Sequence, residues 1–151
     1  MSGFRTDDEK GRYELYAVIS GEVQDVRWTE EDYDWVDGYS TGFPIENKTA
    51  VLEIKRRNEP SSKWEKEGYI FEFDKFVEMK EMQEDNDLAL YVNVFDDVIL
   101  AWDFGKTNAK DLRWGWKKCT HKTSEGLYGQ QMVYKKVTYL RKEDALWTKY
   151  R

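Results

Sequence analysis

Apolar and polar residues recur along this chain with two different periods, and these periods predict its secondary structure. Apolar positions three or four residues apart indicate amphipathic helices at residues 8–20 and 74–84. The continuous apolar run Leu15–Ile19 leaves a strand as the alternative for the first of these. Alternating or short apolar runs between turn residues indicate strands at 23–28, 33–39, 49–57, 69–72, 88–95, 98–104, 113–119 and 131–140. A terminal helix is expected at residues 142–150.

The order of these segments predicts the fold class. A helix is followed by three strands, a short strand, a second helix, a strand hairpin and a β-rich C-terminal part. This mixture is typical of an α+β fold with α/β/α layers, in which helices flank a mixed central β-sheet. The chain has 151 residues and neither an internal repeat nor a low-complexity linker, so residues 1–151 are expected to form a single domain.

The composition excludes several classes of site. One cysteine and one histidine rule out an intrachain disulfide and zinc sites built from several cysteines or imidazoles. A metal here should therefore be hard and oxygen-liganded, such as Mg²⁺ or Mn²⁺. No apolar run exceeds five residues, and the first residues are polar and acidic, unlike a signal peptide. We therefore expect a cytoplasmic protein that does not associate with a membrane.

The net charge and the local clusters of charge give opposite indications about binding to nucleic acid. A net charge of −6 counts against binding to nucleic acid, whose affinity comes largely from neutralised phosphates. A local positive face can still attract a polyanion. Basic residues do cluster, at Lys55–Arg57 with Lys63 and Lys66, at Arg113 with Lys117, Lys118 and Lys122, and at Lys135–Lys136 with Arg141–Lys142. A solvated surface of mixed sign is the alternative interpretation of these runs.

Candidate chemistry lies in the strand predicted at residues 49–57. Alternation along a strand places Glu53 and Lys55 on one face and Leu52 and Ile54 on the other. An acid beside a lysine can serve metal-dependent phosphodiester cleavage, because the acid holds a hard cation and the lysine orients or deprotonates a water. The same acid-x-Lys spacing occurs three more times in the sequence. The alternative is therefore the solvated face of a half-buried strand.

The context of this motif resembles a known family. An acidic run with Asp34 and Asp37 precedes Glu53 and Lys55, and a helix from Asp74 follows them. In this order the chain resembles the PD-(D/E)XK nuclease superfamily, which includes restriction endonucleases and Holliday junction resolvases. Small phage-type members are more similar still, since the motif is followed here by Phe71–Lys75 and then by the aromatic strands Tyr91–Phe95 and Trp102–Phe104. The resemblance covers residues 9–140 and implies a restriction-endonuclease-like fold.

The resemblance also implies a metal site. Asp34 or Asp37, Glu53 and the main-chain carbonyl of Ile54 would bind Mg²⁺ or Mn²⁺, and Lys55 would position or deprotonate the attacking water. A hairpin turn centred near residues 43–44 places Asp34 opposite Glu53, whereas a tighter turn or a bulge would bring Asp37 closer. Both aspartates stay candidates.

Further residues receive roles from the same resemblance. Glu14 on the first helix would complete the outer shell of the metal. Arg56, Arg57 and Lys75 would contact the nucleic-acid backbone. For Lys75, a structural pair with Glu72 is the alternative, and for the two arginines a solvated strand end.

The sequence thus leads to one hypothesis and two alternatives. The hypothesis is an endonuclease-like, metal-dependent nucleic-acid phosphodiester hydrolase, with DNA favoured as the substrate. The first alternative is a catalytically inactive nuclease-fold binding or scaffold protein, which an aromatic content of 16% suits. The second is an acidic inhibitor of a host DNA-binding factor. The oligomeric state is open, with a homodimer among the alternatives.

Overall fold

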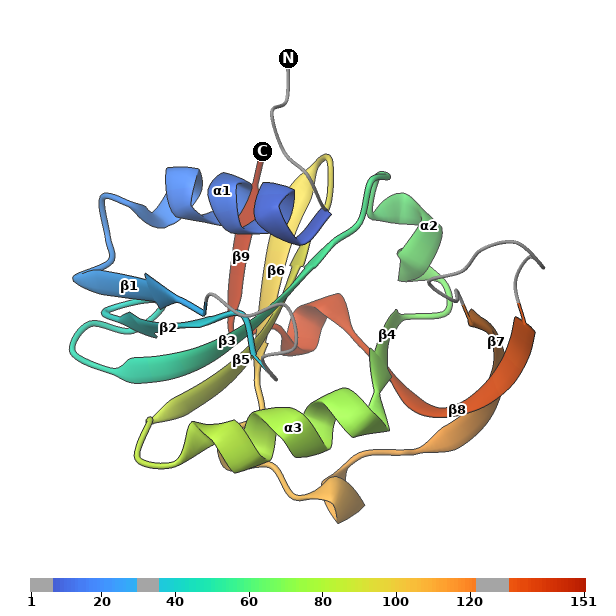
Figure 1. Cartoon of the computed structure of the whole chain (residues 1–151). Helices are drawn as coiled ribbons and strands as arrows, with labels where there is room; N and C mark the ends of the chain where they lie inside the picture. The colour runs from blue at the N-terminus through green and yellow to red at the C-terminus, as the bar shows by residue number, and fades with distance from the viewer. Residues whose placement is uncertain (1–6, 30–35, 122–130) are drawn as a thin grey trace.

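A six-stranded mixed sheet lies at the centre of the computed structural model, which describes residues 7–29, 36–121 and 131–151 (Figure 1). In spatial order its strands are β1 (Asp25–Trp28), β2 (Gly38–Thr41), β3 (Thr49–Arg56), β5 (Leu88–Val94), β6 (Val98–Asp103) and β9 (Trp147–Tyr150). The neighbours β3 and β5 are parallel, and the other neighbours are antiparallel. Strand β5 is buried along its whole length, as its nearly continuous apolar sequence indicates.

Different elements cover the two faces of this sheet. On one face α1 (Asp7–Ile19) buries Leu15 and Ile19 against Leu52 and Ile54 of β3. On the other face lie α3 (Phe73–Gln83) and a small sheet in the order β4 (Tyr69–Glu72), β8 (Gln131–Leu140), β7 (Gly115–His121). The predicted α+β fold, with helices on both faces of a mixed sheet, is confirmed.

Three short elements complete the described structure. They are the helix α2 (Ser62–Glu65) and the two 3₁₀ turns η1 (Ala109–Asp111) and η2 (Lys142–Asp144). Among the described helices, none has the length and apolar character needed to cross a membrane.

The helix predicted at residues 142–150 is wrong. After η2 the chain forms strand β9, which pairs with β6 so that Ala101 lies opposite Trp147 and Val98 opposite Tyr150. The ring of Trp147 packs edge-on against Phe43, with 4.9 Å between the ring centroids. Strand β6 would otherwise leave one edge of its main chain without hydrogen-bond partners, and β9 covers that edge. A partner so distant in sequence overrides the local pattern.

The hairpin of β2 and β3 has a different register from the one expected. Strand β2 begins at Gly38, which pairs with Leu52, and ends at Thr41, which pairs with Thr49. The turn is therefore centred later along the chain than residues 43–44. This shift moves the position facing Glu53 from Asp34 to Asp37. Asp34 itself lies outside the described residues.

Candidate active site

A small pocket on the α3 side of the central sheet contains the predicted acid and lysine. Glu53 and Lys55 point into the same pocket, of about 60 Å³, as strand alternation predicts. The parallel register places Tyr91 of β5 beside Glu53, and α3 contributes Lys75. The remaining lining residues are Arg57, Ile70 and Glu72. The pocket thus combines three basic groups with two carboxylates.

Asp37 directly precedes β2, whose first residue Gly38 pairs with Leu52 of β3. Its main-chain N–H donates to the carbonyl of Leu52 at 2.8 Å, and its Oδ2 accepts a hydrogen bond from the N–H of Ile54 at 2.7 Å. The carboxylate thus accepts the hydrogen bond that a main-chain carbonyl would accept if β2 extended further toward its N-terminus. Its Oδ1 accepts from Arg12 of α1, at 2.9 Å from Nη2 and 3.2 Å from Nε. Asp37 is therefore buried, paired and fixed in orientation.

Glu53 is the most perturbed carboxyl group of the pocket. Its side chain is 10% exposed, and Oε1 lies 3.5 Å from Nζ of Lys75. Burial, and then the negative charge of Asp37, raise the pKa of Glu53 to about 8, although the charges of Lys75 and Lys55 act in the opposite direction. The charge of Asp37 therefore lies close enough to oppose the ionisation of Glu53. A cation between them would relieve this repulsion.

Asp37, Glu53 and the main chain of Ile54 supply oxygen atoms of the kind that hard divalent cations bind. The N–H of Ile54 points to Asp37, and because the N–H and C=O of one strand residue point to the same side, its carbonyl faces that edge as well. Within the described ranges, no group of three or more His, Cys, Asp or Glu side chains converges on one point. Two carboxylates and a carbonyl are nevertheless typical for Mg²⁺, which retains waters and is completed by substrate phosphate.

Lys55 and Arg57 provide positive charge at the pocket. Lys55 is exposed, and its charge acts on Glu53. Arg57 is held in place by hydrogen bonds to Asn93 Oδ1 and to the hydroxyl of Tyr91, each of 3.1 Å. Its guanidinium also lies 4.6 Å from the ring centroid of Trp64. An exposed amine and a guanidinium held by hydrogen bonds therefore border the same pocket.

Arg56 and Glu14 do not belong to this pocket. Strand alternation turns Arg56 to the opposite face of the sheet, where its side chain is 3% exposed. There its guanidinium pairs with Glu14 at 2.6 Å and with Asp96 at 2.7 Å, and it also donates to the main-chain carbonyls of Val94 and Arg57. The roles predicted for Arg56 as a phosphate contact and for Glu14 as an outer metal shell do not fit this placement. Both residues join α1 to the sheet instead.

Lys75 has different partners from those expected. Its ammonium group lies 3.0 Å from Glu78 and 3.5 Å from Glu53, whereas Glu72 pairs with Lys135 at 2.9 Å. The predicted pair of Lys75 with Glu72 is therefore wrong. Burial lowers the pKa of Lys75, but Glu53 and Glu78 more than offset this effect, so the pKa lies above its ordinary value. Lys75 thus remains charged at the pocket.

Arg12 is the residue of this site that the sequence did not indicate. Its partner Asp37 lies 25 positions away, so no local motif connects them. Its position on an amphipathic helix is the only hint in the sequence, and arginines on amphipathic helices are too common for that position to indicate a site.

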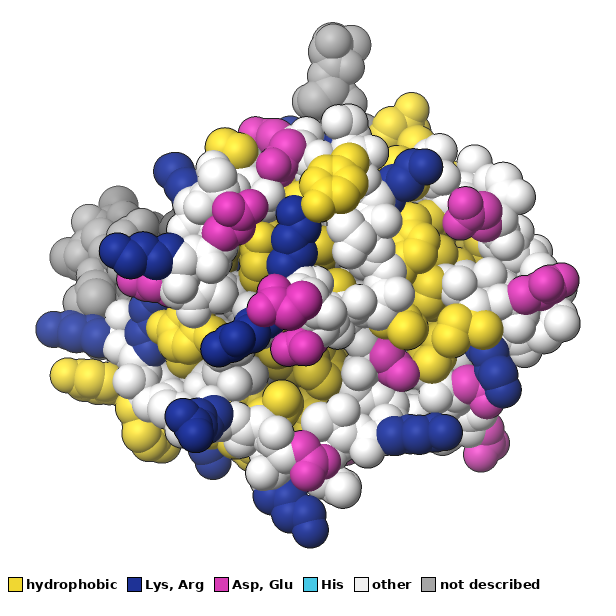
Figure 2. All heavy atoms as spheres, turned by 180° about the vertical axis from the view of Figure 1, so that it is seen from behind, with side chains coloured by type: hydrophobic (Ala, Val, Ile, Leu, Met, Phe, Trp, Pro, Cys, Tyr) yellow, Lys and Arg dark blue, Asp and Glu magenta, His cyan; other side chains and the backbone are white. Residues whose placement is uncertain are grey.

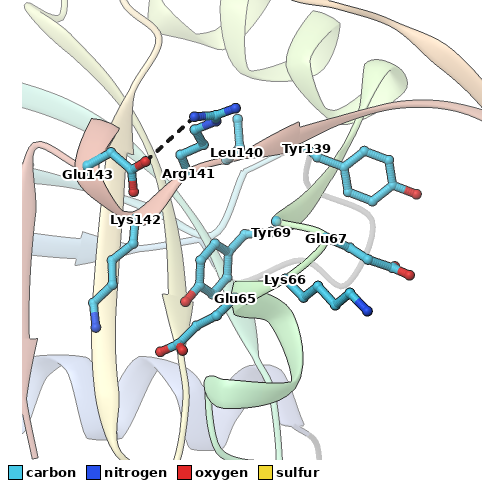
Figure 3. Close-up of a pocket in the computed structure, with 10 residues that line it drawn as sticks. Glu65, Lys66, Glu67, Tyr69, Tyr139, Leu140, Arg141, Lys142 and Glu143 are labelled. Carbon is cyan, nitrogen blue, oxygen red and sulfur yellow. Dashed lines mark ion pairs between the residues drawn. The ribbon is translucent and has the colours of Figure 1, made fainter.

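A larger, open pocket lies elsewhere and shares no residue with the Glu53 pocket. It has a volume of about 570 Å³ and lies between the α2–β4 segment and the end of β8 with η2 (Figure 3). Its charged side chains have mixed sign: Glu65, Glu67 and Glu143 line it together with Lys66, Arg141 and Lys142. Figure 3 shows Arg141 turned toward Glu143, with which it forms a long ion pair of 3.8 Å.

Comparison with protein-family models, with curated proteins and with solved structures finds no match to this chain. A functional conclusion therefore depends on the chemistry and geometry of the Glu53 pocket.

Proposed function

We propose that this protein is a metal-dependent nucleic-acid phosphodiester hydrolase with a restriction-endonuclease-like fold, of the PD-(D/E)XK type. The observation that carries the proposal is the meeting of Asp37 and Glu53 across the β2–β3 hairpin, with Lys55 on the face of Glu53. Support also comes from the order of elements around this hairpin. Helix α1 precedes it, and the chain then crosses over through α3 to the parallel strand β5.

Each group of the pocket has a role in this proposal. Asp37, Glu53 and the carbonyl of Ile54 would hold Mg²⁺ or Mn²⁺, which when bound polarises a phosphate oxygen and lowers the pKa of a water. Lys55 extends from β3 beside the acid, where an amine can orient the attacking water and accept its proton. Lys75 and Arg57 supply fixed positive charge for phosphate oxygens. The sheet and α3 hold these groups on rigid elements.

A second candidate is a nuclease-fold protein that binds nucleic acid without cleaving it. The observation that favours it is the internal pairing of both acids. Arg12 and the Ile54 N–H engage Asp37, and Lys75 engages Glu53. In the catalytic proposal Glu53 would have to release Lys75 in order to hold a cation, whereas in the binding proposal these pairs persist.

Cleavage of plasmid and oligonucleotide substrates tests the first proposal. The wild type should cut DNA with Mg²⁺ or Mn²⁺ and should be inactive with a chelator. Replacing Lys55 by Ala should lower the cleavage rate by roughly 10²-fold or more, because a positioned base contributes about 10²–10⁴-fold. Lys48→Ala is a matched control, since Lys48 is exposed, occurs in a second Glu-x-Lys sequence and lies outside the pocket. Its activity should equal that of the wild type.

Two other outcomes would contradict the catalytic proposal. Unchanged cleavage by Lys55→Ala would locate the chemistry away from this pocket. Absence of cleavage with every metal, DNA and RNA substrate, combined with retained binding, would favour the binding protein.

A further inference from the structure

A two-stranded arm formed by β7 and β8 carries exposed aromatic side chains. The arm stands at the right-hand side of Figure 1, away from the six-stranded sheet. Trp116 on β7 is 72% exposed, and Tyr134 on β8 is 68% exposed. Large aromatic side chains at such exposure bury little apolar area in the folded chain. Their contribution to the stability of the fold is therefore small. Exposed apolar side chains that lie together on a surface can mark a binding site for another molecule.

The antiparallel register places these aromatic residues on one face with two lysines. Trp116 lies opposite Lys136, and Lys118 lies opposite Tyr134. Residues directly opposite each other in an antiparallel pair share a face, and alternate residues of one strand do as well. Trp116, Lys118, Tyr134 and Lys136 therefore form one surface, the aromatic–lysine face. On it each ring has a lysine opposite it on the neighbouring strand.

The charge of the arm has one sign. The described strands β7 and β8 contain four lysines and no aspartate or glutamate, although the whole chain has a net charge of −6. Figure 2 shows this side of the molecule at its left edge, where dark-blue basic side chains lie beside yellow hydrophobic ones next to the grey atoms. Positive charge interspersed with flat rings complements a polyanion that also presents flat rings.

The base of the arm is joined to the rim of the Glu53 pocket by two neighbouring contacts. Lys135, on the other face of β8, forms an ion pair of 2.9 Å with Glu72, which lines that pocket. Lys136 places its ammonium group 4.2 Å from the ring centroid of Phe73, the first residue of α3. Phe73 in turn packs edge-on against Trp114, just before β7, with 5.1 Å between the ring centroids. The base of the arm thus lies beside Glu72, at the rim of the Glu53 pocket.

We propose that the aromatic–lysine face binds a single-stranded segment of nucleic acid, with bases stacked on Trp116 and Tyr134 and phosphates near Lys118 and Lys136. Bases of a single strand offer ring faces that exposed aromatic side chains can stack on, whereas in a duplex the neighbouring base pairs cover those faces. The inference rests on the proposed nucleic-acid substrate and adds the form in which that substrate is held.

Binding of a fluorescent oligothymidylate of about 15 nucleotides, measured with a chelator present, tests the inference separately from cleavage. The wild type should bind the single strand more tightly than a duplex of the same length. Trp116→Ala and Tyr134→Ala should each weaken binding by about 5- to 150-fold, since one stacked base contributes about 1–3 kcal/mol. Tyr150→Ala is the matched control, because Tyr150 is 66% exposed on β9 and should leave affinity unchanged.

The salt dependence gives an independent readout. Each phosphate contact to a single strand contributes about 0.7 to the slope of log affinity against log salt. The double variant Lys118→Gln, Lys136→Gln should therefore lower the slope by about 1.4. Because binding is measured with a chelator present, loss of arm binding is observed separately from loss of metal-dependent cleavage. Equal affinity of Trp116→Ala, Tyr134→Ala and the wild type, or tighter binding of the duplex, would overturn the inference.

Discussion

Replacing Glu53 by Gln should remove most of the pH dependence of stability between about pH 5 and pH 9 when divalent cations are chelated. Burial and the charge of Asp37 raise the pKa of Glu53 from 4.5 in the unfolded chain to about 8 in the folded protein. A raised folded pKa contributes stability that is complete below pH 4.5 and is lost as the pH rises through 8. The wild type should therefore lose roughly 3–5 kcal/mol of unfolding free energy across this range.

Urea denaturation at several pH values measures this effect. The variant should match the wild type near pH 5 and should be the more stable protein near pH 9, because glutamine carries no charge to bury. Other carboxyl groups with shifted pKa values are lowered and act at more acidic pH, namely Glu59, Asp87 and Asp97. Parallel pH profiles for the variant and the wild type would show that Glu53 is not a buried acid with a raised pKa.

Replacing Arg56 by Ala should lower the unfolding free energy by about 3 kcal/mol, because it removes a buried guanidinium from two carboxylates and two main-chain carbonyls. Glu14 keeps its ion pair with Arg151, and Asp96 is half exposed, so the loss lies at the low end for a buried ion pair. Arg56 links Glu14 of α1 and Asp96 of the β5–β6 turn, and its side chain is 3% exposed. Arg57→Ala removes two hydrogen bonds and a cation–π contact at the pocket rim, and should cost about 1–2 kcal/mol. Urea denaturation of both variants measures the contrast.

Binding assays complete this comparison of adjacent arginines. Arg57→Ala should weaken nucleic-acid binding, since its guanidinium borders the pocket. Arg56→Ala should be assayed at urea concentrations and temperatures well below its unfolding midpoint. If this variant bound nucleic acid more weakly and yet was about as stable as the wild type, the side chains of β3 would face the opposite way from the structure. Arg56 would then face the ligand.

Local patterns predicted those features that depend only on strand alternation and helix periodicity. The placement of Glu53 and Lys55 on one face, opposite Leu52 and Ile54, follows from β3 alone. Arg56 follows the same rule, although the run Lys55–Arg57 suggests one basic patch. Alternation divides that run between the two faces of the sheet, so the strand assignment alone predicts that Arg56 points away from the pocket.

Features that depend on distant partners could not be obtained in this way. Strand β9 exists because β6 offers an open edge, and nothing within residues 147–150 specifies that partner. The register of β2 and β3 depends on the conformation of the intervening turn, and it decides between Asp37 and Asp34. The pairs of Arg12 with Asp37 and of Lys75 with Glu53 require the packing of α1 and α3 against the sheet.

The central claim is that Asp37 and Glu53 form one cation site. Calorimetric titration of Mn²⁺ at about pH 7, repeated in buffers with different protonation enthalpies, tests it most directly, because a ligand must lose its proton to bind metal. With a Glu53 pKa of about 8, the wild type should bind the ion and release about one proton. Glu53→Gln should lose both the affinity and the proton release, and Asp37→Asn should lose affinity. No binding by the wild type at about millimolar Mn²⁺, or equal binding by Glu53→Gln, would contradict the claim.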